Sequence, residues 1–314
     1  MKIQLKHIVL SSLSVLITCV GYGQTNVPFI SIDYQAEYIV NKGRLSGAYS
    51  SKYSNGNSKA TGQLINGFKY GEWKLYDSTG TLVLHRLYNA PFQFRQIFPE
   101  QAEAEPAYNL QYNDAGYIPY FEFEQKNIKW SKRVWRNIEE TDNEELFKKD
   151  RLFKLFCDLA DKNSIQLYSA QNDEFTDELE YKQEKFKSIS PIRYQIKEDV
   201  FFDTDRMEME SRIIGICPVA AINGKDQELF WVYLSDIREH LAKHDIKSDF
   251  WERIKTFDDL FFFRDFASSI YKESNHNGKP IEAYKQSDEI ALEAERIEMA
   301  IINKEIDLLL SLAR

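Results

Sequence analysis

Residues 192–219 decide how the C-terminal part of this chain folds, and their sequence is IRYQIKEDVFFDTDRMEMESRIIGICPV. Apolar and polar residues alternate well enough from Tyr194 to Phe202 to predict a strand. Asp203-Thr204-Asp205 then supplies turn-forming residues, and Met207–Ile216 predicts a returning strand. The stretch therefore predicts an antiparallel hairpin.

Further strand and helix signals flank this hairpin. Phe230–Leu234 predicts a third strand, and a helix is expected from about Ser235. Apolar residues at helical spacing predict three more helices, over Leu152–Leu159, Leu260–Ile270 and Ile290–Leu308. Ser287 or Asp288 can cap the last of these, which is the longest. Strands that are grouped together, rather than alternating with helices, indicate an α+β fold and not a doubly wound sheet.

Residues 43–89 have a different composition, rich in glycine, tyrosine and short polar turns. Their alternating segments predict strands at Lys59–Leu64, Glu72–Tyr76 and Leu82–Tyr88. Asn55-Gly56 and Asn66-Gly67 separate such segments, and Asn-Gly pairs suit hairpin turns because both central residues must reach positive φ. The N-terminal part is therefore predicted to be an antiparallel β-hairpin meander.

The same segment resembles the bacterial MORN-variant repeat. The pattern of that repeat is present at Tyr53–Gly56, Gly62–Gly67, Gly71–Trp73 and Tyr76–Gly80, with a looser echo at Tyr112–Tyr117. The resemblance implies a β-hairpin module that contacts other proteins and performs no chemistry. Pro91, Pro99 and Pro106, together with Glu100, Glu103 and Glu105, mark a linker, so the module and its linker are placed at residues 24–124.

The remaining chain, residues 125–314, carries an ordered series of multi-residue motifs. They are Trp130–Ile138, Asn172–Thr176, Ile192–Asp203, Met209–Val219, Leu229–Tyr233, Phe257–Phe261 and Arg264–Asn275. In this order they resemble the GldN/PorN family of gliding motility and type IX secretion proteins. A chance match to one motif is easy, whereas a chance match to all of them in order is not.

The GldN/PorN resemblance implies a periplasmic structural subunit that polymerises into a ring with a GldK/PorK-like lipoprotein beneath the outer membrane. It implies no catalytic residue and no cofactor. The MORN-like module is not an ordinary part of that family, which leaves open whether the chain is the main ring subunit or a paralogue. The alternative from another class is a monomeric periplasmic adaptor that presents the MORN-like module to a different protein.

The first 23 residues have the layout of a secretory signal peptide. Lys2 and Lys6 precede an apolar run at Ile8–Val20, and Gly21-Tyr22-Gly23 places small residues before a cut that leaves Gln24 first. The run is too short to span a bilayer comfortably. Lipoprotein processing at Cys19 is the rival, but the preceding Thr18 fits that signal poorly. The sequence predicts an exported chain, held in the periplasm and associated with the outer membrane through a partner.

The net charge of the chain limits the classes of partner that it can bind. The chain has 40 basic and 49 acidic residues, a net charge of -9, and loss of residues 1–23 removes two lysines and no acid. An acidic surface without a basic stripe repels nucleic acid phosphates and anionic lipid headgroups. The sequence therefore predicts protein partners, no nucleic acid and no direct insertion into the membrane.

Two cysteines remain once the signal peptide is removed, Cys157 and Cys217. They can pair in an oxidising compartment, where a loop of that size would restrain the unfolded chain by roughly 4 kcal/mol. The alternative is that both are small buried hydrophobes, because each lies in an apolar run. Sequence alone leaves the two alternatives open.

Candidate chemistry is sparse. His240 and His244 have the spacing of a helical metal pair, but the glutamate of a zinc-protease helix is missing between them, which favours a wet helix face. The acidic turn at Asp203 and Asp205 lacks the glycine and final glutamate of a calcium loop, which favours a solvated hairpin turn. No phosphate-binding loop, dinucleotide fingerprint or nucleophile elbow occurs. We therefore expect no enzyme, no metal and no cofactor.

Aromatic residues and arginine supply the candidate interface, because Trp, Tyr and Arg dominate the energetics of protein contacts. The candidates are Trp130, Trp135, Arg136, Trp231, Tyr233, Phe261, Phe262 and Phe263. Three consecutive phenylalanines on one helix point in different directions, so one of them is expected to reach a second surface. The alternative for the aromatic candidates is plain core packing.

Overall fold

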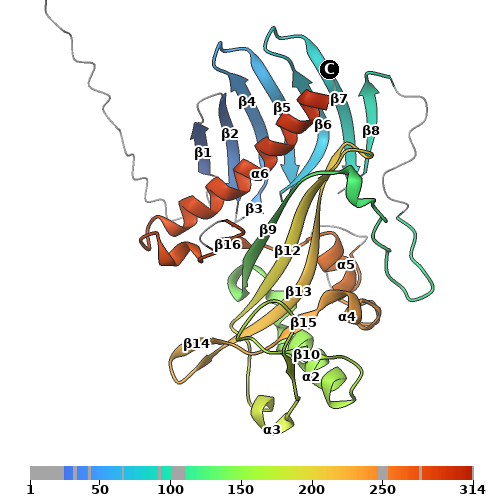
Figure 1. Ribbon diagram of the computed structural model, residues 1–314, viewed down its shortest axis with the longest axis vertical. Helices are drawn as coiled ribbons and strands as arrows, with labels where there is room; N and C mark the ends of the chain where they lie inside the picture. The colour runs from blue at the N-terminus through green and yellow to red at the C-terminus, as the bar shows by residue number, and fades with distance from the viewer. Residues whose placement is uncertain are drawn as a thin grey trace, which may run out of the picture.

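The computed structural model describes residues 25–30, 34–41, 44–65, 67–90, 93–100, 110–246, 254–275 and 278–312. The expected signal peptide and Cys19 lie outside the described residues, as do Pro91 and Pro106 of the expected linker. Figure 1 shows two β-sheets, one above the other, with a long helix lying across the upper one. The predicted α+β class, with an N-terminal meander and a long C-terminal helix, is confirmed.

The N-terminal sheet is an antiparallel meander in the strand order β1-β2-β4-β5-β6-β7-β8, with β3 paired to β2. Its strands are β1 (Thr25–Ile30), β2 (Tyr34–Asn41), β3 (Arg44–Leu45), β4 (Gly47–Tyr53), β5 (Ser58–Ile65), β6 (Phe68–Tyr76), β7 (Leu82–Ala90) and β8 (Gln93–Phe98). The three predicted strands are confirmed as β5, β6 and β7. Gly56 has a φ of 89°, as the Asn-Gly turn requires. Gly62 makes room for Trp73, since an added Cβ would lie 2.2 Å from the indole ring.

The second sheet has the order β11-β10-β15-β13-β12-β9-β16, with β14 paired to β13. Its strands are β9 (Ile128–Glu139), β10 (Leu167–Tyr168), β11 (Glu178–Leu179), β12 (Arg193–Asp203), β13 (Glu208–Ile222), β14 (Lys225–Glu228), β15 (Trp231–Tyr233) and β16 (Ser269–Glu273). The predicted hairpin is confirmed as β12 and β13, whose register runs to Asp203 opposite Glu208 at the tip. Strand β9 pairs along the other side of β12.

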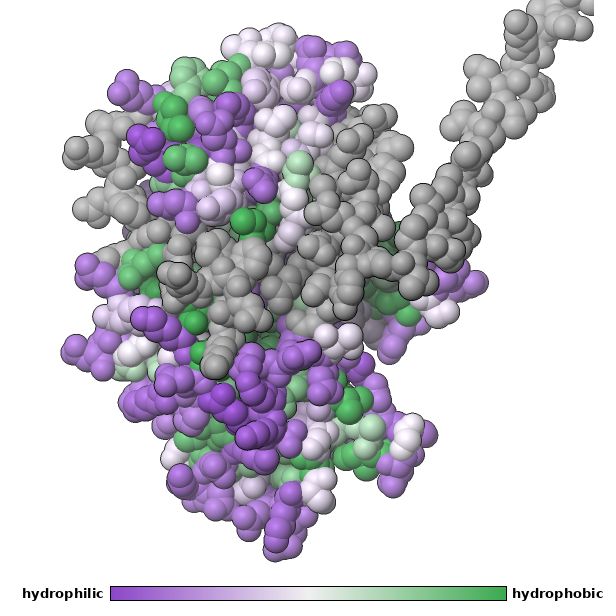
Figure 2. Space-filling model, turned by 180° about the vertical axis from the view of Figure 1, so that it is seen from behind, coloured by the Kyte–Doolittle hydropathy of each residue, from purple (hydrophilic) through white to green (hydrophobic). Residues whose placement is uncertain are grey.

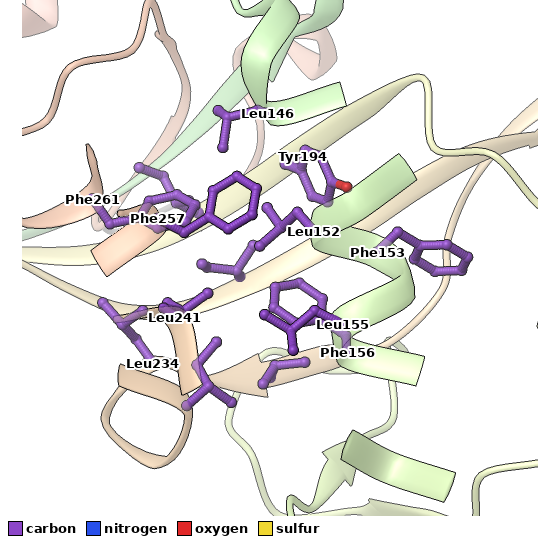
Figure 3. Close-up of a cluster of buried hydrophobic side chains, with 14 of the residues drawn as sticks. Leu146, Leu152, Phe153, Leu155, Phe156, Tyr194, Leu234, Leu241, Phe257 and Phe261 are labelled. Carbon is purple, nitrogen blue, oxygen red and sulfur yellow. The ribbon is translucent and has the colours of Figure 1, made fainter. Parts of the chain in front are cut away.

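Short helices cover one face of this second sheet. They are α1 (Glu144–Phe147), α2 (Arg151–Asp161), α3 (Gln183–Phe186), α4 (Leu234–Leu241) and α5 (Phe257–Phe262). Leu152 and Phe156 of α2 meet Tyr194 of β12 and Phe257 of α5 in a shared apolar core (Figure 3). Burying each large apolar side chain contributes about 1.5–3 kcal/mol, so this core dominates the stability of the lower part.

The helix predicted over Leu260–Ile270 is too long. Thr256 caps α5 through a capping box with Asp259, and the helix ends at Phe262. Arg264 then adopts a φ of 55°, a left-handed conformation that stops helix propagation. Ile270 instead pairs with Arg136 as part of β16. The prediction failed because the apolar residues keep a helical spacing across the turn at Arg264 and into strand β16, whose residue Ile270 is buried.

The longest helix, α6 (Ile290–Leu312), joins the two sheets. Its first half packs Ala294 and Ile297 against Val134 and Val200 of the second sheet. Its second half packs on the N-terminal sheet, where residues such as Met299 and Ile306 share a core with Trp73 and Leu75. Among the described residues, no helix combines the length and the apolar character that crossing a membrane requires.

Residues 110–124, which the sequence prediction grouped with the MORN-like module and its linker, do not form the second hairpin that their sequence echo suggested. They form no strand, and Ile118 belongs to the core beneath α4 and α5. The Arg238 guanidinium of α4 donates to the backbone oxygen of Ile118 at 2.7 Å. The sequence echo at Tyr112–Tyr117 therefore marks a turn and not a second hairpin, because Asn113 and Tyr117 close it with a 3.0 Å backbone hydrogen bond.

Candidate functional site

The tip of the β12–β13 hairpin reaches the N-terminal sheet and α6. Phe202, fully buried near the end of β12, lies in the core that Trp73 and Met299 share, and Met207 and Met209 pack against it. Figure 1 shows the hairpin rising from the lower sheet to the strands of the upper one. The hairpin tip, which belongs to the C-terminal part, therefore packs into the core between the N-terminal sheet and α6. We call it the hairpin wedge.

An ion-pair cluster lies at this tip, made of Lys69, Arg86, Tyr88, Glu208 and Glu305. The Lys69 ammonium lies 2.7 Å from the Glu208 carboxylate and also contacts Glu305 on α6. Arg86 is 3.2 Å from Glu208, and the Tyr88 hydroxyl donates to the same carboxylate at 3.0 Å. All four charged side chains are at most 10% exposed, so their charges interact through little water.

Burial and charge move the pKa values of this cluster. Burial disfavours the Lys69 cation, but Glu208 and Glu305 more than offset that and hold its pKa above the ordinary value. Burial raises the pKa of Glu305 to about 7, with the neighbouring Glu208 acting in the same direction and Lys69 opposing it. One lysine between two buried carboxylates keeps its charge, and burial makes the carboxyl group on α6 hard to ionise.

A second buried cluster links β9, β12 and α6 through Arg136, Glu198, Arg264 and Glu298. Arg136 donates to Glu198 at 2.5 Å and grips Glu298 of α6 with two further bonds of 2.5 and 2.9 Å. Arg264 contacts the other oxygen of Glu198. Burial raises the pKa of Glu198, but Arg264 and Arg136 more than offset it and lower that pKa below the ordinary value. Arg136, expected at an interface, is an internal ion-pair residue and is only 7% exposed.

A cavity of about 110 Å³ lies between the two clusters. Charged side chains from both sheets and from α6 line it, among them Lys69, Arg136, Glu208, Glu298 and Glu305. Its volume is enough for a few water molecules, and its walls carry donors and acceptors for them. Because the charged side chains that line the cavity are paired with one another, we interpret it as part of the contact between the two sheets and α6.

Most of the other expected interface residues are also buried. Trp135, Trp231, Phe261, Phe262 and Phe263 are each at most 5% exposed. The expectation that one of the three phenylalanines reaches a second surface is wrong, because Tyr120 covers Phe262 at a ring distance of 5.6 Å. Trp130 is half-buried and packs against the Ile297 and Met209 region. Tyr233, at 39%, is the one clearly exposed residue of the predicted set.

The opposite face of the second sheet carries a buried lysine. Lys197 of β12 is 1% exposed, and its ammonium contacts the backbone oxygen of Asp173. Lys272 of β16 reaches the same residue, 3.2 Å from its carboxylate. Burial raises the pKa of the Asp173 carboxyl, but Lys197 and Lys272 outweigh it, and the net shift is downward. No sequence signal singled out Lys197, because a lysine in an alternating strand is ordinarily solvated.

The cysteines and histidines form no site in the described part of the chain. Cys157 and Cys217 are both free thiols. Cys157 packs with the helices, whereas Cys217 lies with Trp135 and Trp231 on the other face, so the unpaired alternative is the one observed. His244 hydrogen-bonds through Nδ1 to the His240 carbonyl oxygen at 2.9 Å. Among the described residues, no group of three or more His, Cys, Asp or Glu has a metal-binding arrangement.

The acidic turn is not the solvated hairpin turn that the sequence favoured. Asp203 is 1% exposed, and its carboxylate accepts from the Arg206 guanidinium at 2.9 Å. Glu210 is equally buried and contacts Arg206, and Arg212 donates to it at 2.5 Å. Only the turn residue Asp205 is exposed. The carboxylates of the hairpin tip can be buried inside the molecule because arginine side chains neutralise their charge.

The chain is therefore a two-sheet α+β protein in which a C-terminal helix and a long hairpin join the sheets through buried ion pairs. The model of the family described as "Gliding motility associated protein GldN" matches residues 123–309. The chain belongs to this family, which makes it a protein associated with gliding motility and type IX secretion. The match does not extend over residues 43–89, where the MORN-like resemblance stays a prediction. A comparison with curated proteins found no match.

Proposed function

We propose that this protein is a non-enzymatic structural subunit of a periplasmic, outer-membrane-associated assembly for type IX secretion or gliding motility. In that assembly it forms a ring with copies of itself and with a GldK/PorK-like lipoprotein. The single observation that carries the proposal is the family match over residues 123–309, which covers the whole second sheet and most of α6.

Two structural features support an assembly role. Strand β8 ends the N-terminal sheet, and among the described residues no strand pairs with its outer side, which can therefore pair with another backbone. At the β8 edge, Ile97 and Phe98 are 38% and 44% exposed. Exposed apolar side chains on an edge strand suit a contact with another subunit, since they lose water there.

The hydrophilic surface supports partner binding through selected patches. Figure 2 shows hydrophilic residues over most of the lower half of the rear face, with smaller hydrophobic areas between them. Hydrophilic surface therefore separates the exposed hydrophobic areas on this face. Such a distribution favours specific contacts at a few positions over general stickiness.

The adaptor alternative is weakened by the packing of the N-terminal sheet. Its inner face is already occupied by α6 and by the hairpin wedge, so only its outer face and edges are left to present. A module that is fixed in this way suits a rigid subunit better than a tethered binding domain. The adaptor would still require a protein that is monodisperse when purified alone.

A complementation experiment tests the proposed function. The gene for this chain is deleted in its host, and the strain then receives either the unaltered gene or an I97S/F98S variant. We expect deletion to abolish secretion of extracellular proteins and surface spreading, and the unaltered gene to restore both. The variant should accumulate normally and still fail to restore them. The matched control is L292S, which changes a residue of α6 that is 61% exposed and should complement fully. Normal secretion and spreading in the deleted strain would overturn the proposal.

A further inference from the structure

A ten-residue segment crosses the face of the second sheet that the helices leave open. We name residues 169–178 the strap; they connect β10 to the edge strand β11. The β10–β11 pairing brings its ends together, where the Ser169 amide donates to the Asp177 backbone oxygen at 2.7 Å and Asn172 donates to the Asp177 carboxylate at 2.6 Å. At its centre Phe175 has a φ of 57°, a left-handed conformation that is costly for a side chain of this size.

Phe175 fills a slot in the sheet face that another residue has left open. Gly215 of β13 forms the floor, and a Cβ there would lie 2.4 Å from the Phe175 ring. Three aromatic rings surround Phe175 edge-on, at centroid distances of 5.5 Å for Tyr168, 5.9 Å for Trp231 and 5.4 Å for Tyr233. The slot is therefore an aromatic box with a glycine floor, sized for one ring.

Two lysines make the slot basic. The Lys197 ammonium lies 5.4 Å from the Phe175 ring centre and 3.4 Å from an Asp173 carboxylate oxygen. Lys272 lies 4.1 Å from the Trp135 ring centre and 3.2 Å from the other Asp173 oxygen. Asp173 thus pairs with both lysines, and the carboxylate of the exposed Glu174 lies 3.5 Å from the Lys197 ammonium. The occupant that satisfies this slot is a carboxylate followed two residues later by an aromatic ring.

The strap satisfies the slot incompletely. The indole N–H groups of Trp135 and Trp231 are buried, and neither has a hydrogen-bond acceptor among the described residues. On the same face, Gln195 and Asn137 face each other across β12 and β9, and the side-chain oxygen of each is buried without a donor. Buried donors and acceptors without partners are costly, so an occupant that supplied them would bind better than the strap does.

We propose that this slot is a docking site for an acidic–aromatic segment of a partner protein, and that the strap occupies it in the free chain. The partner segment displaces Asp173 and Phe175, places its own carboxylate between Lys197 and Lys272, and inserts its own ring over Gly215. The charge of the slot selects an acidic segment, and the aromatic box selects the ring. The site goes beyond the proposed function, because it takes such a segment whether or not the chain is part of a ring.

Peptide binding in trans tests this site. The probe is a fluorescent peptide with the strap sequence SAQNDEFTDE, and the readout is fluorescence anisotropy with the chain from Gln24 onward. Two variants loosen the strap in different ways: F175A empties the aromatic box, and D173N removes the carboxylate that the lysines share. We expect each variant to bind the peptide at least ten-fold more tightly than the unaltered chain. Circular dichroism and thermal melting establish whether each variant is folded. If F175A does not fold, D173N alone tests the site.

Control peptides and a slot variant make the result specific. A peptide with alanine in place of the phenylalanine, and one with lysine in place of the first aspartate, should each bind at least ten-fold more weakly. K272M, which removes a partly exposed lysine of the slot, should weaken peptide binding when added to either strap variant. Folded strap variants that bind no peptide, or bind the control peptides equally well, would overturn the proposal.

Discussion

The Tyr49 hydroxyl in strand β4 donates a 2.6 Å hydrogen bond to the side-chain oxygen of Asn303 in α6, across 254 residues of sequence. Two ion pairs also join the N-terminal sheet to α6: Lys59 lies 2.6 Å from Asp307, and Lys69 contacts Glu305. The N-terminal sheet and the GldN-type part are therefore one body. We expect one cooperative unfolding transition, with coincident midpoints by far-ultraviolet circular dichroism and tryptophan fluorescence. Two separate transitions would show that α6 does not couple the sheets.

Removing Lys69 should destabilise the protein strongly. K69M leaves Glu208 and Glu305 buried with Arg86 as the remaining cation, and breaking a buried pair in this way costs about 3–5 kcal/mol. K74M is the matched control, because Lys74 pairs with the exposed Glu72 at the surface and such pairs contribute little to stability. Urea unfolding of both variants measures the difference. Equal, small losses would contradict the buried cluster.

Glu305 should make stability fall as pH rises from about 4.5 to 7. Burial raises its pKa in the folded protein to about 7 from an ordinary value of 4.5. Between these values the folded state holds a proton that the unfolded state has lost, so each pH unit costs at most about 1.4 kcal/mol. E305Q removes the titrating group. The difference in unfolding free energy between the unaltered protein and E305Q should therefore slope downward across this window and be flat below it.

Arg136 should matter for stability and not for partner binding. R136A leaves Glu198 and Glu298 without the guanidinium that bridges them, and we expect a loss of about 3–5 kcal/mol. The control is R133A, three residues earlier on β9, whose partner Asp199 is 37% exposed and whose loss should cost about 1 kcal/mol or less. Guanidinium unfolding compares the two. A folded R136A of ordinary stability would return Arg136 to the candidate interface.

Tyr233 and Phe262 should separate assembly from folding. Phe262 is 3% exposed, and F262A should cost about 3–5 kcal/mol because it leaves a cavity in the core. Tyr233 is 39% exposed, so Y233A should leave the melting temperature nearly unchanged. Co-purification with envelope proteins then reports on the surface, and we expect only Y233A to reduce it in a stable protein. Unchanged co-purification with Y233A would remove the last exposed aromatic of the predicted set.

Local pattern predicted the elements well. Strands β5, β6, β7, β12 and β13, and the helices α2 and α6, follow from alternation and helical spacing, because each element buries one face. Residues 110–124 were expected to echo the hairpins because their turn chemistry is similar, but they form no strand and contact α4, which lies far along the chain. Turn residues report local backbone shape and carry no information on the surface that they cover.

The site was predicted less well, for reasons of chemistry. Arg136 and Trp231 have the residue types that favour interfaces, but the same types occur in buried ion pairs and cores. One of Phe261, Phe262 and Phe263 was expected outside, because consecutive residues of a helix point in different directions. Instead, α5 is covered on both sides, by the second sheet and by Tyr120. The Lys69 cluster needed three distant segments to meet, and no local signal marks any of its members as buried.

Affinity purification of the tagged chain from detergent-solubilised envelope tests the assembly function most directly. Mass spectrometry identifies the co-purified proteins, and negative-stain imaging shows the particles. We expect a GldK/PorK-like lipoprotein in the eluate and large ring-shaped particles in the images. A monodisperse monomer without an envelope lipoprotein would contradict the ring-subunit function and favour the adaptor.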